Sequence, residues 1–463
     1  MQKLKTKYFY FGIFFFFLTL VLGLVFFKEL LMPWTWVLGQ SLVILFFYIG
    51  VISLYWHLKN LTSTKIIINL FIINFLLKIL VLFFTYSYIV DINGVGVFTN
   101  LDAKFYYNKA VYYSNHIIEL FKITNRIPLS DSGVIIYYSL IYYLTTPHVF
   151  MGGVFNVLFA SLSAVLLYKI ILMLDEKRIA LLSAIVMSLL PIFNSYIAIH
   201  LKEIFFVWLI LLGVYYVLKI IIFKNVNIYY LSIVLLVLVS LFAFRNVIAL
   251  IFLLSIVIYV LFNNYIRKGL FLRIIILFVV LGTSYLFVQF TSAKQEQDQY
   301  YERVSDDNPN SPSAYKIEQK RGSGSMIKIV LGIPSQIIFS VISPFPTIVE
   351  DKSIGYESNI TLRMLIADGF IKGFLGYFFF WGFLSNIKNR SLLFFSSFIG
   401  LNIIIISIVG MALNFRFFMP ILPLFIYYSI KGILLKKRNK DIGFSFYMVS
   451  LVGVHLLFNF YKI

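Results

Sequence analysis

The chain has 463 residues, of which 61% are hydrophobic and 13% are charged, and its mean hydropathy is +0.93. About a quarter of the residues of a soluble domain are charged. This composition therefore excludes a soluble globular protein and indicates one that crosses a membrane many times. The formal net charge of +20 does not indicate a nucleic-acid partner, because lysines of membrane proteins collect in cytoplasmic loops and no basic helix with base-reading side chains is present.

Apolar runs of about 20 residues, the length of a membrane-spanning helix, follow one another along most of the chain. They fall near 8–27, 34–56, 66–89, 149–173, 179–199, 203–223, 227–243, 246–263, 270–290, 364–385, 391–412, 416–434 and 443–460. The first run lacks the small-residue cleavage site of a signal peptide, so we expect a retained anchor. A shorter run at 134–144 is interpreted as a re-entrant or interfacial piece. The predicted fold is all-α and polytopic, with roughly 12 to 14 transmembrane helices.

Two polar segments interrupt this pattern, at 90–132 and at 291–362. The first contains amphipathic stretches that predict interfacial helices, and the second begins with a charged, proline-containing loop and continues into a proline-broken apolar stretch at 326–346. The sequence therefore divides into three parts. These are a transmembrane bundle over 1–290 that includes the loop 90–132, a large outer loop with an interfacial helix over 291–362, and C-terminal transmembrane helices over 363–463.

The distribution of basic residues predicts which loops lie outside. Lysines near the N-terminus and the basic cluster at 436–440 both belong in the cytoplasm by the positive-inside rule. Counting spans from either end then places 90–132, the turn at 200–203, Arg245 and 291–362 outside, and Arg416 at the outer end of a span. We therefore expect a cytoplasmic N-terminus and a functional site on the outer face.

Five ionisable residues meet on that predicted outer side: Asp102, Lys202, Glu203, Arg245 and Arg416. Ionisable groups at membrane depth are costly unless they are paired or hydrated, so they often mark a functional cavity. Structural alternatives exist for each. Asp102 can cap a helix, Lys202 and Glu203 can form a simple interfacial pair, and the two arginines can extend to lipid headgroups.

The stretch 100–113, NLDAKFYYNKAVYY, carries a single carboxylate ahead of four tyrosines. In a helix, Asp102, Tyr106, Lys109 and Tyr113 share one stripe, so we expect the last three to line a substrate site headed by the carboxylate. The tyrosines also suit an aromatic belt at the membrane interface without any further purpose.

The chemistry that these groups suit is group transfer from a lipid phosphate to an alcohol. Arg245, Arg416 and Lys202 can neutralise a phosphate or pyrophosphate, and a lone carboxylate such as Asp102 can act as general base on a hydroxyl. The sequence has no HExxH, P-loop or Rossmann glycine motif and no cysteine, and its five histidines are scattered. No cofactor is certain, although a divalent cation held by Asp102 or Glu203 stays open.

At these residues the sequence resembles the GT-C superfamily of polytopic glycosyltransferases, which use polyprenyl-phosphate-linked sugars. Asp102, Ala103, Tyr106 and Ala110 are similar to the first outer loop of that family, with its acidic residue ahead of a tyrosine-rich helix. The segment 178–219, with Pro191 and Glu203, resembles its span–turn–span unit; LFAFRNVIAL (241–250) resembles its arginine-bearing turn, and RFFMPILPLF (416–425) its late arginine–proline span.

The resemblance implies roles for four of these residues. Asp102 is the implied base on the acceptor hydroxyl, Glu203 has a supporting or metal role, and Arg245 and Arg416 lie near the lipid phosphate. The function it implies is an inverting glycosyltransferase of a bacterial inner membrane, which moves a sugar from an undecaprenyl-phosphate-linked donor to a glycan or lipid-linked acceptor on the outer face during O-antigen or capsule synthesis. A repeat-unit polymerase of the same pathways and a flippase or transporter for the lipid-linked sugar remain as alternatives.

Overall fold

The computed structural model describes residues 34–93, 101–125, 129–223, 227–262, 358–389, 392–408, 415–435 and 438–462, together with single positions within 10–21 and 337–341. The predicted spans at 270–290 and, apart from those single positions, at 8–27 lie outside the described residues. So does most of the predicted outer loop 291–362.

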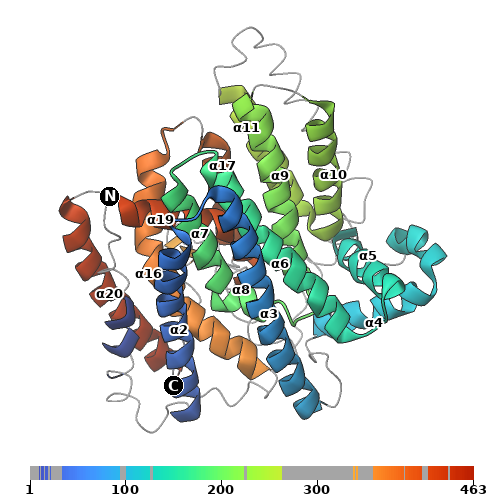
Figure 1. Cartoon of the computed structure of the whole chain (residues 1–463), viewed down its shortest axis with the longest axis horizontal. Coiled ribbons are helices and arrows are strands. Elements are labelled where there is room, and N and C mark those ends of the chain that lie inside the picture. Colours follow the sequence, from blue (N-terminus) through green and yellow to red (C-terminus); the bar gives the residue numbers. More distant parts are fainter. Residues whose placement is uncertain are drawn as a thin grey trace, which may run out of the picture.

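The described part of the chain is helical throughout and contains no strand (Figure 1). Its helices are α2 (Trp34–Leu58), α3 (Ser63–Asn93), α4 (Leu101–Asn115), η1 (Ile117–Asn125), α5 (Leu129–Leu144), α6 (Val149–Leu172), α7 (Lys177–Leu189), α8 (Pro191–Ser195), α9 (Glu203–Phe223), α10 (Ile228–Phe244), α11 (Asn246–Phe262), α16 (Ser358–Asn386), α17 (Leu393–Ile408), α18 (Phe415–Phe418), η4 (Met419–Ile421), α19 (Leu422–Leu434) and α20 (Arg438–Lys462).

Many of these helices have the length and composition of membrane spans. Five are long and apolar enough to cross a bilayer, over Leu38–Leu58, Ser63–Asp91, Val149–Leu172, Glu203–Ile222 and Arg416–Leu434, and four shorter apolar helices accompany them among the described residues. On α2, apolar side chains at i, i+4, i+8 and i+11 (Leu38, Leu42, Phe46 and Ile49) are exposed, as on a helix that faces lipid. The prediction of an all-α membrane protein is confirmed; the predicted number of spans stays a prediction.

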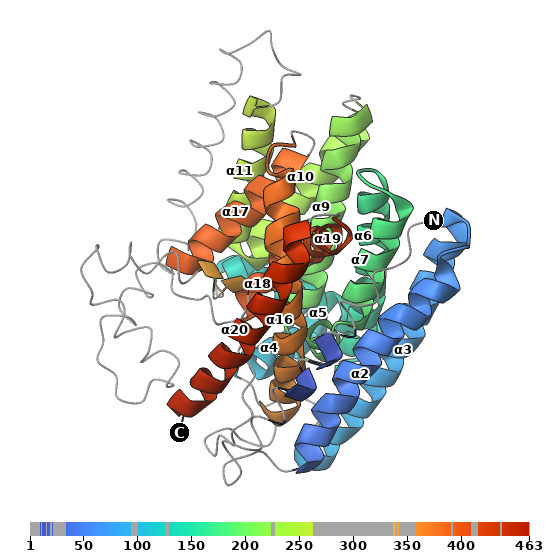
Figure 2. The same cartoon turned by 90° about the vertical axis from the view of Figure 1, so that its left-hand side faces the viewer.

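The centre of the bundle is formed by helices that are buried on all sides. Every residue of α7 from Ile179 to Leu189 is buried, and so is nearly all of α19. Helices α16 and α19 approach each other at Gly382 and Gly432, where a Cβ atom on either glycine would collide with a backbone carbonyl of the other helix. Figure 2 views this pair from the side of α20. Only residues without a side chain permit so close a contact.

The predicted span at 179–199 is interrupted, which corrects the expectation of one continuous helix. Helix α7 ends at Leu189 and the short α8 begins at Pro191, because proline has no N–H to continue the ladder. The carbonyl of Ser188 accepts a hydrogen bond from Lys78 Nζ at 2.9 Å and another from Asn194 Nδ2 at 3.2 Å. A buried ammonium thus caps the broken helix end, where cations are favoured.

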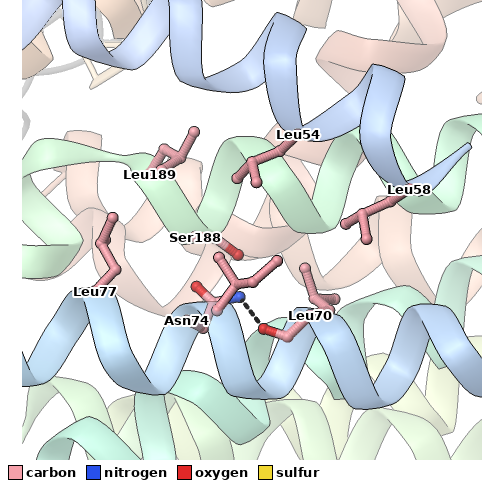
Figure 3. A pocket seen from close by; sticks show the side chains of 8 residues that line it. Leu54, Leu58, Leu70, Asn74, Leu77, Ser188 and Leu189 are labelled. Carbon is pink, nitrogen blue, oxygen red and sulfur yellow. Dashed lines mark hydrogen bonds between the residues drawn. The ribbon is translucent and has the colours of Figure 1, made fainter.

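A small pocket lies beside this cap, between α2, α3 and α7 (Figure 3). It is lined by Leu54, Leu58, Leu70, Ile73, Asn74, Leu77, Ser188 and Leu189. Its volume of about 10 Å³ is the room of about one water molecule, and nearly all of its lining is apolar. This pocket is therefore too small for a sugar or a lipid headgroup.

Helix α5, which contains the doubtful run 134–144, lies beside α4 instead of crossing the bundle (Figure 1). Two adjacent tyrosines of α4 bind the two ends of α5. Tyr106 Oη donates to Asp131, in the first turn of α5, at 2.7 Å. Tyr107 Oη donates to the carbonyl of Pro147, just beyond the last turn of α5, at 3.2 Å. Both ends of α5 therefore lie at the same end of the bundle, as a re-entrant or interfacial segment requires.

The loops at the other end of the bundle are held together by a second set of polar contacts. Lys177 Nζ donates to the carbonyl of Leu61, which joins the start of α7 to the α2–α3 loop. Asp175 accepts hydrogen bonds from Lys431 Nζ at 2.6 Å and from Tyr427 Oη at 2.8 Å. These are the loops in which the sequence places the cytoplasmic basic residues.

Candidate functional site

Six charged side chains meet at the end of the bundle where α4 and α5 lie. This charged cluster consists of Asp102, Asp131, Lys202, Glu203, Arg245 and Arg416. Its three carboxylates all stand in the first turn of a helix, of α4, α5 and α9, and Arg245 stands at the C-cap of α10. Helix dipoles favour anions at N-termini and cations at C-termini, so each of these helices supplies the sign of charge that its own end stabilises.

Arg416 is the centre of the cluster and joins residues that are far apart in the sequence. Its Nη1 donates to Asp102 Oδ2 at 2.8 Å and its Nε donates to Glu203 Oε1 at 2.9 Å. The side chain of Glu203 is 2% exposed, whereas that of Asp102 is 48% exposed. One guanidinium thus bridges a buried carboxylate and a half-exposed one.

Arg245 contacts both Glu203 and the backbone of Arg416. Its Nη2 lies 3.6 Å from Glu203 Oε1, and its Nη1 donates to the backbone carbonyl of Arg416 at 3.3 Å. The guanidinium also lies 4.8 Å from the ring centroid of Phe417, a distance at which the aromatic face attracts a cation. The two arginines therefore hold each other's position as well as sharing Glu203.

Asp131 organises the second half of the cluster. Its Oδ1 accepts hydrogen bonds from Lys202 Nζ at 2.9 Å and from Tyr106 Oη at 2.7 Å. Burial alone would raise the pKa of this carboxyl, but the charge of Lys202 and the two hydrogen bonds outweigh burial and lower its pKa below the ordinary value. Burial, with the charges of Asp131 and other acids nearby, raises the pKa of Tyr106 far above its ordinary value, so this phenol stays protonated and donates.

The irregular segment between α8 and α9 places Lys202 and Glu203 in the site. Asn156 Nδ2 donates to the carbonyl of Ile197 at 3.1 Å, and Tyr138 Oη donates to the carbonyl of Leu201 at 3.2 Å. His200 stacks on Tyr138 with ring centroids 4.8 Å apart, and burial lowers its pKa to about 3, which keeps it neutral. Neighbouring side chains thus satisfy two backbone carbonyls of this buried, non-helical segment.

The structure places the three predicted substrate-lining residues in three different environments. Tyr106 joins the cluster through Asp131. Tyr113 is buried and packs against the ring of Tyr112, and Lys109 is exposed with its ammonium 5.9 Å from the ring of Phe105. Within the part of the chain that the structure describes, neither Tyr113 nor Lys109 contacts the charged cluster.

The buried face of α4 explains this distribution. It includes Ala103, Tyr106, Ala110 and Tyr113, so the predicted stripe is displaced by one residue at its first and third positions. At 3.6 residues per turn, residues three and four after Tyr106 both lie near the same face, and the small alanine, not the lysine, is turned inward.

One polar atom at the centre of the cluster has no partner. Glu203 Oε2 is buried and forms no hydrogen bond to any residue that the structure describes, while Oε1 serves both arginines. Among the described residues there is no group of three or more histidine, aspartate or glutamate side chains that could hold a metal ion. The described part of the cluster thus consists of cations and carboxylates joined by ion pairs.

Asp131 is the residue of the cluster that the sequence interpretation missed. A signal for it exists, because Asp131 comes shortly after Pro128 and shortly before the apolar run 134–144, as an acidic residue in the first turn of a helix does. The four residues at 102, 203, 245 and 416 are brought together as the sequence leads one to expect, and Lys202, next to Glu203 in the sequence, forms an ion pair with Asp131.

The sequence matches no model of a known protein family and no curated protein. What this chain does must therefore be argued from the charged cluster and its place in a membrane-embedded helical fold.

Proposed function

We propose that the protein is a glycosyltransferase of GT-C type that works on the outer face of a bacterial inner membrane. In this proposal it transfers a sugar from a polyprenyl-phosphate-linked donor to a hydroxyl of a glycan or lipid-linked acceptor. The observation that carries the proposal is the charged cluster itself: three cations and three carboxylates from distant parts of the sequence gathered at one end of an apolar bundle.

The composition of the cluster supports a lipid phosphate as ligand. Arginine and lysine side chains neutralise phosphate oxygens, and arginine does so with two parallel donors. The amphipathic α4 lies beside the cluster, with Lys104, Phe105, Asn108, Lys109 and Tyr112 on its exposed face. Such a face suits the headgroup region, where a lipid phosphate and a water-borne acceptor both have access.

The proposed reaction gives one role to Asp102 and another to the three cations of the cluster. Asp102, the most exposed of the three carboxylates, accepts the proton of the acceptor hydroxyl as its oxygen attacks the anomeric carbon of the donor sugar. The bond from that carbon to the phosphate oxygen breaks, and its electron pair leaves with the phosphate. Arg416, Arg245 and Lys202 stabilise the departing negative charge, and Glu203 holds the two arginines.

The test is the structure of the surface glycan in a deletion strain and in complemented strains. Loss of one sugar from the glycan supports the proposal, whereas a glycan of single repeats indicates a polymerase and accumulation of cytoplasmic lipid-linked sugar indicates a flippase. Asp102→Asn and Arg416→Gln should fail to restore the missing sugar, with a loss of transfer of at least about a hundredfold. Asp91→Asn, a change at an exposed carboxylate of α3, is the matched control and should restore it.

The side of the membrane is tested separately by cysteine labelling, since the chain has no native cysteine. Lys109→Cys on the exposed face of α4 should react with an impermeant reagent added outside, and Lys388→Cys, exposed beyond α16, should react only after lysis. Position 203 suits this experiment poorly because its side chain is buried. Labelling of Lys109→Cys from the cytoplasm alone would contradict an outer-face site.

A further inference from the structure

Among the described residues, the three cations of the cluster equal its three carboxylates in number, and this bears on how an anion can enter. Lys202, Arg245 and Arg416 are each in an ion pair with a carboxylate of the cluster. A phosphate brings further negative charge to a partly buried place, where an anion needs cationic partners of its own. A carboxylate that gives up its cation supplies the phosphate with such a partner.

The three carboxylates differ in how firmly they are held. Glu203 is 2% exposed and shared by two arginines, so an incoming ligand cannot reach or replace it. Asp131 is 30% exposed and is fixed by both Lys202 and Tyr106. Asp102 is 48% exposed, and it accepts a hydrogen bond from Nη1 of Arg416 at 2.8 Å. Of the three pairs, the one between Asp102 and Arg416 is therefore the one that an incoming ligand reaches most easily.

Arg416 keeps its place when that pair opens. Its Nε remains hydrogen-bonded to Glu203 Oε1, and its backbone carbonyl remains bonded to Arg245 Nη1. The guanidinium is thus anchored on its buried side by contacts that do not involve Asp102. Its Nη1 is a positioned donor at the outer edge of the cluster, and the occupant of that position can change without rebuilding the site.

From these contacts we propose that the donor's phosphate binds Arg416 Nη1 by displacing the carboxylate of Asp102, and that this exchange releases Asp102 to act as the base. This inference rests on the proposed function and adds an order of events to it. The base is paired with Arg416 until a donor phosphate occupies its position. Only then does the carboxylate accept the proton of the acceptor hydroxyl, while the phosphate keeps the electron pair of the broken bond to the sugar.

The position of Asp102 in the first turn of α4 makes the exchange feasible. A carboxylate there is stabilised by the N-terminal end of the helix dipole, independently of Arg416. Its half-exposed side chain is also solvated. The released group therefore remains an anion beside the phosphate site instead of requiring a new cationic partner.

The experiment measures binding of undecaprenyl phosphate to the purified full-length protein in detergent, by microscale thermophoresis. The exchange predicts that Asp102→Asn binds this lipid about two- to fivefold more tightly than the wild type, the range expected from removing an exposed ion pair that competes with the ligand. Asp91→Asn removes the same charge elsewhere on the surface and should leave the affinity unchanged. Arg416→Gln should bind at least tenfold more weakly.

The outcomes separate the exchange from the function on which it rests. Equal or weaker binding by Asp102→Asn, with binding by the wild type still dependent on Arg416, overturns the exchange and leaves the proposed transferase standing. Lipid binding that is the same in the wild type and in Arg416→Gln overturns the phosphate site and with it both proposals. Inorganic phosphate, added as a competitor, should bind more weakly than the lipid but rank the variants in the same order of affinity, because phosphate oxygens make the contact that replaces Asp102. The reverse order overturns the exchange.

Discussion

The two ends of the bundle hold their charges in contrasting ways. At the end with α4, Arg416 bridges one carboxylate that is buried and one that is half exposed, and the carboxylates and cations come from several helices. At the other end, Asp175 takes hydrogen bonds from Lys431 and Tyr427, which stand one turn apart on α19. The second arrangement joins two segments, and the side chains of Asp175 and Lys431 are exposed to a similar, small extent. The first has one carboxylate that solvent reaches, whereas both charged groups of the second are largely covered.

The largest expected effect is that of removing the shared carboxylate from the charged cluster. Glu203→Ala leaves Arg245 and Arg416 without the buried carboxylate that they share. The free energy of unfolding should therefore fall by about 3–5 kcal/mol. Titration with sodium dodecyl sulfate in mixed micelles measures this change. Glu119→Ala, at an acid of η1 that accepts a hydrogen bond from Tyr112 on the exposed side of α4, is the control. Equal loss in both variants would show that the cluster is not a buried network.

A smaller effect is expected at the opposite end, and there it should concern stability alone. Lys431→Met removes the ammonium from Asp175 but leaves the hydrogen bond from Tyr427, so the loss should be about 1.5–3 kcal/mol. The double variant Asp175→Asn with Lys431→Met should recover part of this loss, because no unpaired charge remains. The surface glycan should be unchanged in both variants. If the glycan changes in a strain that contains normal amounts of protein, this end of the bundle has a functional role that its geometry does not indicate.

The smallest expected effect is a change in acid sensitivity at Asp131. Its pKa is lowered in the folded protein, so the unfolded chain takes up the proton first as the pH falls below the ordinary value of 3.8. The pair with Lys202 therefore stabilises the fold above that pH and loses its contribution below it. Between about pH 5 and pH 3 the wild type should lose about 0.2–1 kcal/mol more stability than Asp131→Asn. Parallel pH profiles for the two proteins would show that the pair contributes nothing.

The comparison of the two ends also shows which features are predictable from sequence. Hydropathy and the positive-inside rule assign each loop to an end, and that assignment is sufficient to bring Asp102, Glu203, Arg245 and Arg416 to the same end. Their pairing is not predictable, because it depends on which helices lie next to each other, and lateral packing depends on contacts such as the one between Gly382 and Gly432.

Two local features are not predictable from the pattern of apolar residues. The break between α7 and α8 is signalled by Pro191, but an apolar run of spanning length hides it, since hydropathy does not report hydrogen-bond continuity. A helical wheel places Lys109 near Tyr106 and Tyr113, whereas the structure buries Ala110 beside them and leaves Lys109 exposed, because close packing accommodates a methyl group and not a charged chain. The role of Lys109 at a substrate site stays a prediction.

The hydrogen bond between Lys78 and Ser188 has a consequence for the order in which the protein is made. Lys78 lies near the middle of α3, where a lysine opposes membrane insertion by about 2.5–3.5 kcal/mol. Its carbonyl partner is 110 residues further along the chain, which at a synthesis rate of about 5–20 residues per second is about 5–20 s of translation. Until α7 has been made, the partner within α3 itself is Asn74, whose Oδ1 accepts a hydrogen bond from Lys78 Nζ at 3.0 Å. We therefore expect the polar contacts of α3 to be completed only after a later helix has been made.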